Sequence, residues 1–287
     1  MRRERSQEKC DQSGTVPGKL FIVGVPIGHP DDITVRALST LRQVDLIAAK
    51  NPQATQALLS HHGIQAAVTT YDRESAAEKT PVLLERLHQG LQIALVSDCG
   101  MPAIYDPGRV LISAVAKAQL PIEVIPGPSA AIAAAALCGM DGDAFVFDGR
   151  WAGGLDNMTH RLQALRSESR IMIFLPPAQT LSRLLSRILA ILGNRRVVVA
   201  RDLTKATQKV VRGRVRTVLA QNALHDAGSQ ITLIVEDWRG SGMTTYSSRR
   251  FRITTRKDSS ARSCETTSCP SSLTLRGTFR IGSPSSR

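Results

Sequence analysis

Between Gly18 and Gly139 the chain alternates short apolar runs with amphipathic segments, and this alternation constrains its fold more than any other feature. The apolar runs have the length of buried strands, and the segments between them carry apolar residues at helical spacing. A helix between two strands returns the chain to the same edge of a sheet, so successive strands run in the same direction. The pattern predicts an α/β domain with a mostly parallel sheet and helices on both faces.

The predicted strands of this first block are Leu20–Gly24, Asp45–Ala49, Ala67–Tyr71, Ile93–Ser97 and Ile122–Ile125. The predicted helices are Thr34–Gln43, Gln53–His62, Ala76–Gln89 and Arg109–Ala118, with a small-residue helix at Ala131–Leu137.

A second block follows, and it both begins and ends with strands. Its predicted strands are Phe145–Gly149, Ile171–Leu175, Arg196–Arg201, Lys209–Arg214 and Gln230–Asp237, and its predicted helices are Asn157–Arg166, Ala178–Leu192 and Val215–Leu224. The third and fourth of these strands are close in sequence, which indicates antiparallel pairing and therefore a mixed sheet. We place a domain boundary near residues 139–144, which gives an N-terminal α/β domain over 19–140 and a C-terminal α/β domain over 141–238.

Charge is concentrated at one end of the chain. The formal net charge is +13, and residues 239–287 contain ten basic and two acidic residues, with Ser or Thr at 20 of the 49 positions. This composition predicts a disordered basic tail, and residues 1–18 are expected to form a disordered extension. The tail is either a solvated extension or an RNA-binding segment, because excess positive charge suits a polyanionic partner.

Transmembrane and disulfide-bonded classes are disfavoured. The longest apolar stretch, Ala130 to Cys138, is far shorter than the roughly 20 residues that span a bilayer. The five cysteines are scattered and form no C-x-x-C pair, so reduced thiols in a cytoplasmic protein are expected. His61 and His62 are adjacent, and on a helix their side chains would diverge, so we predict surface histidines and no metal site.

Three turns follow predicted strands of the first block, where an open parallel sheet usually binds its ligand. The first, Gly24 to Asp32, is neither a G-x-G-x-x-G motif nor a phosphate-binding loop, because Pro26 removes an N–H group. Asp32 is a candidate cap for the following helix. Binding of a nucleotide phosphate is therefore disfavoured at this turn.

The second turn, Ser97 to Gly108, contains two Gly, two Pro and two Asp residues, which impose a tightly bent path. It is either a rigid turn in which Asp106 caps the next helix, or a ligand loop in which Asp98 and backbone carbonyls face a cationic ligand such as a sulfonium. The third turn, Pro126 to Ala130, leads into the small-residue helix, and Pro128 is expected to preset its first turn. Each turn alone is explained by packing, but the three together favour a ligand site.

In this order and spacing, the three turns resemble those of the tetrapyrrole-methylase superfamily, and more narrowly the ribosomal RNA small subunit methyltransferase I family. The stretches that carry the resemblance lie within roughly residues 18–237 and are Val25–Gly28, Asp32–Thr34, Arg36–Leu38, Val44–Ala49, Ser97–Gly108, Ile125–Ala130, Val198–Lys205 and Arg212-Gly213. The resemblance implies a methyltransferase that holds S-adenosylmethionine in a cleft between two α/β domains and methylates a cytidine 2′-hydroxyl of small-subunit rRNA. It also implies a homodimer.

The resemblance assigns the site residues as well. Those implied to contact the cofactor, mainly through main-chain atoms, are Pro26, Gly28, Ser97, Asp98, Gly100, Met101, Pro102, Ile104, Asp106, Pro128, Ser129 and Ala130. A 2′-hydroxyl is a weak nucleophile that benefits from a group to accept or displace its proton. Lys205 and Asp98 are our catalytic candidates, although Lys205 could equally contact a phosphate or simply be solvated.

The chain also departs from the family pattern. Lys50 to Gln53 replace Glu-Asp-Thr-Arg, Leu175 to Thr180 replace Tyr-Glu-Ser-Pro-His-Arg, and Trp151 to Gly154 replace a basic stretch. Cys99, Met101 and Tyr105 stand for Ala, Thr and Ser. Two alternatives therefore stay open: a methylase of a tetrapyrrole or another small molecule, and a cofactor-binding homologue that has lost catalysis.

Overall fold

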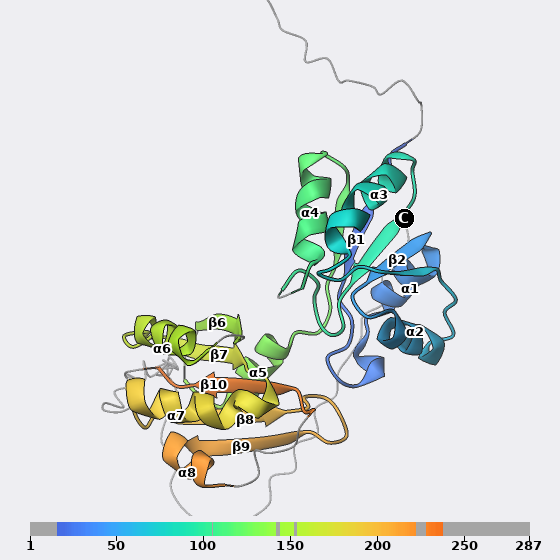
Figure 1. Ribbon diagram of the computed structural model, residues 1–287. Coiled ribbons are helices and arrows are strands. Elements are labelled where there is room, and N and C mark those ends of the chain that lie inside the picture. The colour runs from blue at the N-terminus through green and yellow to red at the C-terminus, as the bar shows by residue number, and fades with distance from the viewer. Residues whose placement is uncertain (1–15, 105, 142–143, 152–153, 222–227, 238–287) are drawn as a thin grey trace, which may run out of the picture. The chain divides into compact units, whose positions relative to one another are not determined.

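The computed structural model describes residues 16–237, apart from 105, 142–143, 152–153 and 222–227 (Figure 1). The predicted N-terminal extension therefore lies outside the described residues except at 16–18, and the predicted basic tail over 239–287 lies wholly outside them. Within the described part of the chain, no helix is long and apolar enough to cross a membrane.

The first sheet is entirely parallel, as the alternation predicts. Its five strands stand in the order β3-β2-β4-β1-β5. Their bounds are β1 Leu20–Val23, β2 Leu46–Ala49, β3 Val68–Thr70, β4 Ile93–Val96 and β5 Ile122–Ile125. The order puts β1 between β4 and β5, so the turns that follow these three strands emerge side by side at one edge of the sheet.

Helices cover both faces of this sheet, which confirms the prediction (Figure 1). Their bounds are η1 Pro30–Asp32, α1 Val35–Gln43, α2 Pro52–His61, α3 Ala76–His88 and α4 Gly108–Lys117. Leu41 of α1 and Leu59 of α2 pack on one face, whereas Leu87 of α3 and Leu111 of α4 pack on the other. Each helix thus buries one apolar stripe and exposes the opposite side.

The expected cap of α1 is wrong by two residues. Asp32 ends the short 3₁₀ turn η1, and the side chain of Thr34 accepts the hydrogen bond from the Ala37 N–H group. Pro128 does not enter the first turn of α5 either, because Ser129 is its N-cap and the helix begins at Ala130. In both places a hydroxyl next to the helix satisfies an otherwise unpaired N–H group.

The second sheet is mixed, again as predicted, with the strand order β6-β7-β10-β8-β9. Only β6 and β7 pair in parallel, and the other neighbours are antiparallel. The strands are β6 Phe145–Arg150, β7 Ile171–Leu175, β8 Arg196–Arg201, β9 Lys209–Arg214 and β10 Ile231–Val235. The helices are α5 Ala130–Cys138, α6 Leu155–Ala164, η2 Ala178–Thr180, α7 Leu181–Ile191 and α8 Val215–Ala220.

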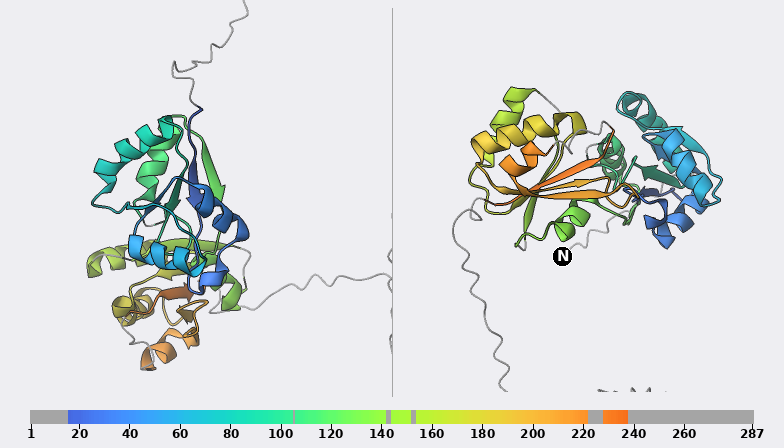
Figure 2. Two further views of the ribbon diagram at one scale, coloured as in Figure 1. Left: turned by 90° about the vertical axis from the view of Figure 1, so that its right-hand side faces the viewer. Right: turned by 90° about the horizontal axis from the view of Figure 1, so that it is seen from below.

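The second sheet is covered by α5 on one face and by α6, α7 and α8 on the other (Figure 2). Ala131 and Ala134 of α5 pack against Ile173 and Val198 of the sheet, where small side chains allow a close approach. The chain thus reaches the second sheet before the predicted boundary near residues 139–144. That boundary stays a prediction.

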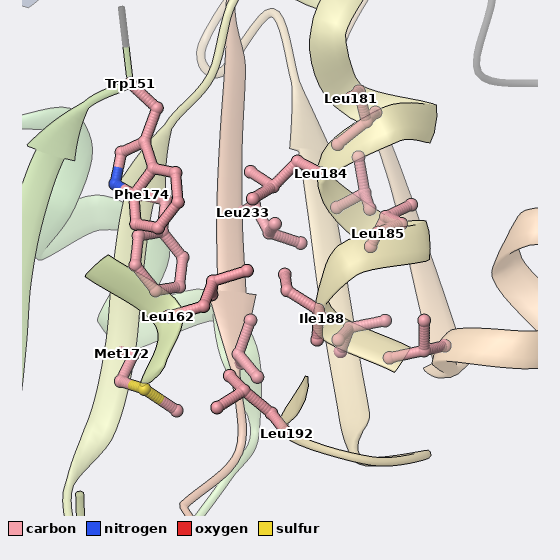
Figure 3. Close-up of a cluster of buried hydrophobic side chains, with 14 of the residues drawn as sticks. Trp151, Leu162, Met172, Phe174, Leu181, Leu184, Leu185, Ile188, Leu192 and Leu233 are labelled. Carbon is pink, nitrogen blue, oxygen red and sulfur yellow. The ribbon is translucent and has the colours of Figure 1, made fainter. Parts of the chain in front are cut away.

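The larger core of this half lies under α7 (Figure 3). Leu184 and Leu185 are fully buried there, and the Trp151 ring stands edge-on to Phe174 with centroids 5.1 Å apart. The Arg161 guanidinium lies 4.4 Å from the Trp151 ring centroid, in a cation–π arrangement. Trp151, the first of the four residues that replace a basic stretch of the family, is therefore a core residue of this chain.

Candidate active site

The turns after β1 and β4 are joined by backbone hydrogen bonds. Val25 and Gly100 form an isolated antiparallel bridge, in which the Val25 N–H donates to the Gly100 carbonyl at 3.0 Å and the Gly100 N–H donates to the Val25 carbonyl at 3.1 Å. Gly100 has φ +71°, in the left-handed region that favours glycine. The bridge holds two of the three predicted loops in register.

The turns after β1 and β5 touch through two glycines that face each other. A Cβ atom built on Gly127 would lie 2.7 Å from the Gly24 carbonyl carbon, and one built on Gly24 would lie 2.6 Å from the Gly127 Cα. Such distances are too short for any real Cβ atom, so both positions require glycine for the loops to approach this closely. The three predicted loops therefore meet at one place.

Asp106 organises the loop after β4. Its Oδ1 atom accepts hydrogen bonds from the N–H groups of Ala103 and Gly108, both at 2.8 Å, and Ala103 adopts a positive φ of 72°. The predicted cap is displaced by one residue, because Pro107 is the N-cap of α4 and Asp106, just before it, accepts a hydrogen bond from the Gly108 N–H group. Burial raises the pKa of Asp106, against the opposing effect of these two hydrogen bonds. Its Oδ2 atom is buried and has no hydrogen-bond partner among the described residues.

A cavity of about 670 Å³ opens beside the joined loops. This is the size of a small-molecule site, which typically measures roughly 300–1,000 Å³. Eight of the twelve predicted cofactor residues line it: Ser97, Asp98, Gly100, Met101, Ile104, Asp106, Ser129 and Ala130. The structure therefore brings most of the predicted set together around one space.

The other predicted residues lie around this cavity without lining it. Pro26 and Gly28 line a smaller cavity of about 350 Å³, which shares Ser97 and Asp98 with the larger one. Pro102 is buried. Pro128 lies beside Gly100, since the Pro128 carbonyl oxygen is 3.4 Å from the position that a Gly100 Cβ atom would take.

The opposite wall of the larger cavity comes from the second sheet, and sequence reasoning missed it. Phe145 and Phe147 of β6 supply apolar surface, Arg150 supplies a positive charge, and Gln230 supplies an amide. The remaining lining residues of this half are Leu175, Pro176, Pro177, Leu203, Ser229, Ile231 and Thr232. The sequence signals for this wall were the position of Arg150 directly after a predicted strand and the family stretches that contain Leu175 to Pro177 and Leu203.

Lys50 is a second missed cation, and it forms an ion pair with Asp98 in the wall of the cavity. It stands at the end of β2, where the family pattern has an acidic residue, and its side chain is about one-third exposed. Since β2 and β4 are neighbours in the sheet, the residues that follow them come within reach of each other. The Asp98 carboxylate is thus close to a positive charge of the protein itself.

Lys205, the other catalytic candidate, does not line the cavity. Its ammonium lies 3.0 Å from the Asp202 Oδ1 atom, and its side chain packs over Gly28. Burial opposes ionisation of Asp202, but hydrogen bonds from the Gln230 N–H group and from Lys205 outweigh it and lower the pKa of Asp202. The next residue back, Thr204, has a hydroxyl that accepts a hydrogen bond from the His29 N–H group at 2.9 Å.

Comparison with known proteins agrees with this architecture. The model of the tetrapyrrole (corrin/porphyrin) methylases matches residues 19–219. The ribosomal RNA small subunit methyltransferase I of Thermotoga maritima is 36% identical over 218 residues, which cover 76% of this chain and 98% of that protein. The protein of the same name from Escherichia coli O157:H7 is 40% identical over 67% of this chain and 68% of its own length.

Among solved structures, a uroporphyrin-III C-methyltransferase from Thermus thermophilus, complexed with S-adenosylhomocysteine, matches with a TM-score of 0.57. It is 15% identical and covers 78% of this chain and all of that chain, so it supports the fold alone. The family model matches most of the chain, and the two relatives are 36% and 40% identical to it. Together they show that this chain belongs to the ribosomal RNA small subunit methyltransferase I family of the S-adenosylmethionine-dependent tetrapyrrole methylases.

Proposed function

We propose that the protein transfers a methyl group from S-adenosylmethionine to the 2′-hydroxyl of a cytidine in small-subunit ribosomal RNA. The observation that carries this proposal is the cavity at the meeting point of the three loops, which has acidic groups on the loop wall and cations beside them. The names of the relatives supply the class of substrate. The cytidine 2′-hydroxyl is the acceptor implied by the family resemblance.

The residues of the loop wall fit the cofactor. The wall has a buried carboxyl oxygen on Asp106, which has no hydrogen-bond partner within the described part of the chain, and a carboxylate on Asp98. Both suit a cationic ligand. Glycines at positions 24, 100 and 127 keep side chains out of the junction. When bound, the cofactor supplies an electrophilic methyl carbon on a positively charged sulfur. The residues proposed to hold it are the twelve named from the sequence, of which eight line the cavity.

The two cations in the cavity wall suit an RNA strand. Lys50 and Arg150 both line it, and Arg150 stands at the end of β6 on the side of the second sheet. Guanidinium and ammonium groups bind phosphates, which position a nucleic acid without reading its sequence. We assign Lys50 and Arg150 to the RNA backbone near the reacting nucleotide.

Methyl transfer needs the acceptor oxygen in line with the methyl carbon, so positioning is the main contribution of the protein. Asp98 is our candidate to accept the hydroxyl proton, because it is a carboxylate in the cavity wall. Lys205 is our candidate to offset negative charge near the acceptor. Lys205 does not line the cavity, but its partner Asp202 adjoins it. Asp202 precedes Leu203 in the chain and accepts a hydrogen bond from the Gln230 N–H group, and both Leu203 and Gln230 line the cavity.

A second candidate function is a homologue that binds the cofactor without transferring its methyl group. The ion pair between Lys50 and Asp98 favours it. Asp98 is the carboxylate proposed to accept the hydroxyl proton, and the Lys50 ammonium is already paired with it. Loss of the acidic residue at position 50 is the sequence change that creates this pair. The two candidates differ in transfer and not in binding.

One experiment separates them. The purified protein is incubated with S-adenosylmethionine labelled in its methyl group and with small ribosomal subunits that lack the modification, and the labelled nucleotide is mapped. The proposal expects label on one cytidine ribose, and fully methylated subunits serve as the control. Calorimetric binding of the cofactor with no label in RNA would support the second candidate. Label on a base or on a small molecule alone would contradict the proposed acceptor.

Ribosomal RNA as the substrate places the proposed activity in the cytoplasm. A homodimer is part of the same proposal, and it rests on the family resemblance alone. Light scattering of the purified protein tests it: a mass of about twice the 31.1 kDa chain is expected, and a mass equal to one chain contradicts it.

A further inference from the structure

Three side chains outside the larger cavity form a cluster of metal-binding type. They are Asp31 of η1, His61 at the end of α2 and His62 directly after it. One potential ligand atom from each lies within 4.8 Å of the other two. The His61 Nε2 and Asp31 Oδ1 atoms are 2.9 Å apart, so two of the three already touch.

The two adjacent histidines converge, contrary to the divergence expected on a helix. The helix ends at His61, and His62 has φ −98° and ψ 12°, which is no longer helical geometry. Its backbone N–H group still bonds to the Leu58 and Leu59 carbonyls, and the turn brings the two rings edge to face with centroids 4.7 Å apart. The sequence-based argument against a metal therefore fails on geometry, because it assumed that the helix continued.

Neighbouring groups fix the orientation of the cluster. The His62 Nε2 atom lies 3.1 Å from the Pro30 carbonyl oxygen, so a proton on that nitrogen leaves the other ring nitrogen free to act as a ligand. The Asp31 N–H group donates to the His29 Nδ1 atom at 3.2 Å. Hydrogen bonds of this kind, from carbonyls and neighbouring side chains, orient the ligands of known metal sites.

We propose that Asp31, His61 and His62 bind a divalent first-row transition metal ion such as Zn²⁺, with water completing the coordination. Two imidazoles and one carboxylate form a donor set that binds Zn²⁺ in many proteins. With bonds of roughly 2.0–2.1 Å, tetrahedral ligand atoms stand about 3.4 Å apart, so small side-chain rotations bring these three into place. Asp31 and His61 are exposed, which gives the ion a route from solvent.

The metal-binding cluster lies between two segments of the chain, so a bound ion would join them. Asp31 belongs to the connection between β1 and α1, which also contains Pro26 and Gly28 of the first loop, whereas the histidines belong to the end of α2. A bound ion links these two segments. The smaller cavity beside Ser97 is lined by Pro26, Gly28, Pro30 and His61, so the link lies along its wall. The proposal does not depend on methyl transfer.

The test is calorimetric titration of the untagged, chelator-treated full chain with ZnCl₂, compared with His61→Ala, His62→Ala and Asp31→Asn. We expect one saturable site with a dissociation constant on the order of micromolar, weakened at least tenfold in each variant. His88→Ala and His160→Ala are the matched controls, because both histidines are exposed on other helices, and both should bind as the unaltered chain does. Zn²⁺ should raise the melting temperature of the unaltered chain by a few degrees and leave that of His61→Ala unchanged.

Two results would overturn the proposal. One is the absence of saturable binding to the unaltered chain. The other is binding by both the His61→Ala and the His62→Ala variant as tight as that of the unaltered chain, which would assign the ion to thiols or to other histidines. The altered side chains lie at the surface or half-buried, and urea unfolding without metal verifies that each variant is folded before it is compared.

Discussion

Replacing Gly127 with alanine is expected to separate two of the loops that form the cavity. The new Cβ atom would stand 2.7 Å from the Gly24 carbonyl carbon and 2.8 Å from the Gly24 Cα and carbonyl oxygen. These are backbone atoms, which cannot rotate away as a side chain can. Restoring an ordinary contact of 3.4 Å needs a movement of about 0.7 Å between the turns after β1 and β5.

The magnitude follows from that movement. Overpacking of a well-packed site costs about 1–3 kcal/mol, and a misplacement of about 1 Å in a binding constellation reduces rates by up to roughly a hundredfold. We therefore expect the affinity of Gly127→Ala for S-adenosylmethionine to fall by about ten- to a hundredfold, which corresponds to about 1.4–2.7 kcal/mol. The protein is expected to remain folded, because a cost of about 1–3 kcal/mol is smaller than the roughly 5–15 kcal/mol by which folded proteins are stable.

The assay is isothermal titration with S-adenosylmethionine. Gly154→Ala is the matched control, because among the described residues no atom beyond its chain neighbours lies within 4 Å of a Cβ atom added there. Its affinity should stay within about twofold. Gly24→Ala should reproduce the loss, since its Cβ would meet Gly127 in the same contact. Binding by Gly127→Ala as tight as that of the unaltered chain would refute the role assigned to the junction.

Three further predictions concern charge and packing. Asp98→Ala should weaken cofactor binding, measured by calorimetry, about three- to tenfold, whereas deletion of residues 239–287 should leave the affinity unchanged. Equal affinity of Asp98→Ala and the unaltered chain would remove Asp98 from the pocket. Because burial raises the pKa of Asp106 above its ordinary 3.8, the stability that it contributes is complete below that pH and is lost as the pH rises through the folded value. The free energy of urea unfolding, relative to that of Asp106→Asn, should therefore fall as the pH rises above about 4, and a rise would contradict the raised pKa. Leu185→Ala should reduce the free energy of unfolding by about 2–5 kcal/mol, because this side chain is fully buried under α7; the exposed Ser186→Ala should change it by less than about 0.5 kcal/mol, and a similar loss in both would refute the packing argument.

The elements of the fold were predictable because each has a local cause. The strand 122–125 and the strands 171–175, 196–201 and 209–214 occupy the predicted residues. Apolar runs of strand length and helical spacing are properties of neighbouring residues, so they can be read along the chain. Errors concentrate at the ends of helices, where Thr34 and Ser129 compete as caps with nearby polar or proline residues.

The loop wall of the cavity was also predictable, because the carboxyl ends of neighbouring parallel strands meet at one edge. The opposite wall was not, because Phe147 and Arg150 of β6 come near Gln230, which precedes β10, only through the strand order β6-β7-β10 of the second sheet. The pairing of Lys50 with Asp98 likewise depends on β2 and β4 being neighbours although three elements separate them in sequence. Such contacts have no local signature.

The central claim, that the turns after β1, β4 and β5 jointly hold the cofactor, is tested most directly by amide hydrogen exchange of the unaltered chain with and without saturating S-adenosylhomocysteine. We expect slower exchange in peptides that cover residues 24–28, 97–104 and 127–132, and unchanged exchange in the connection over 62–67. Calorimetrically verified binding that leaves exchange at all three turns unaltered would contradict the claim.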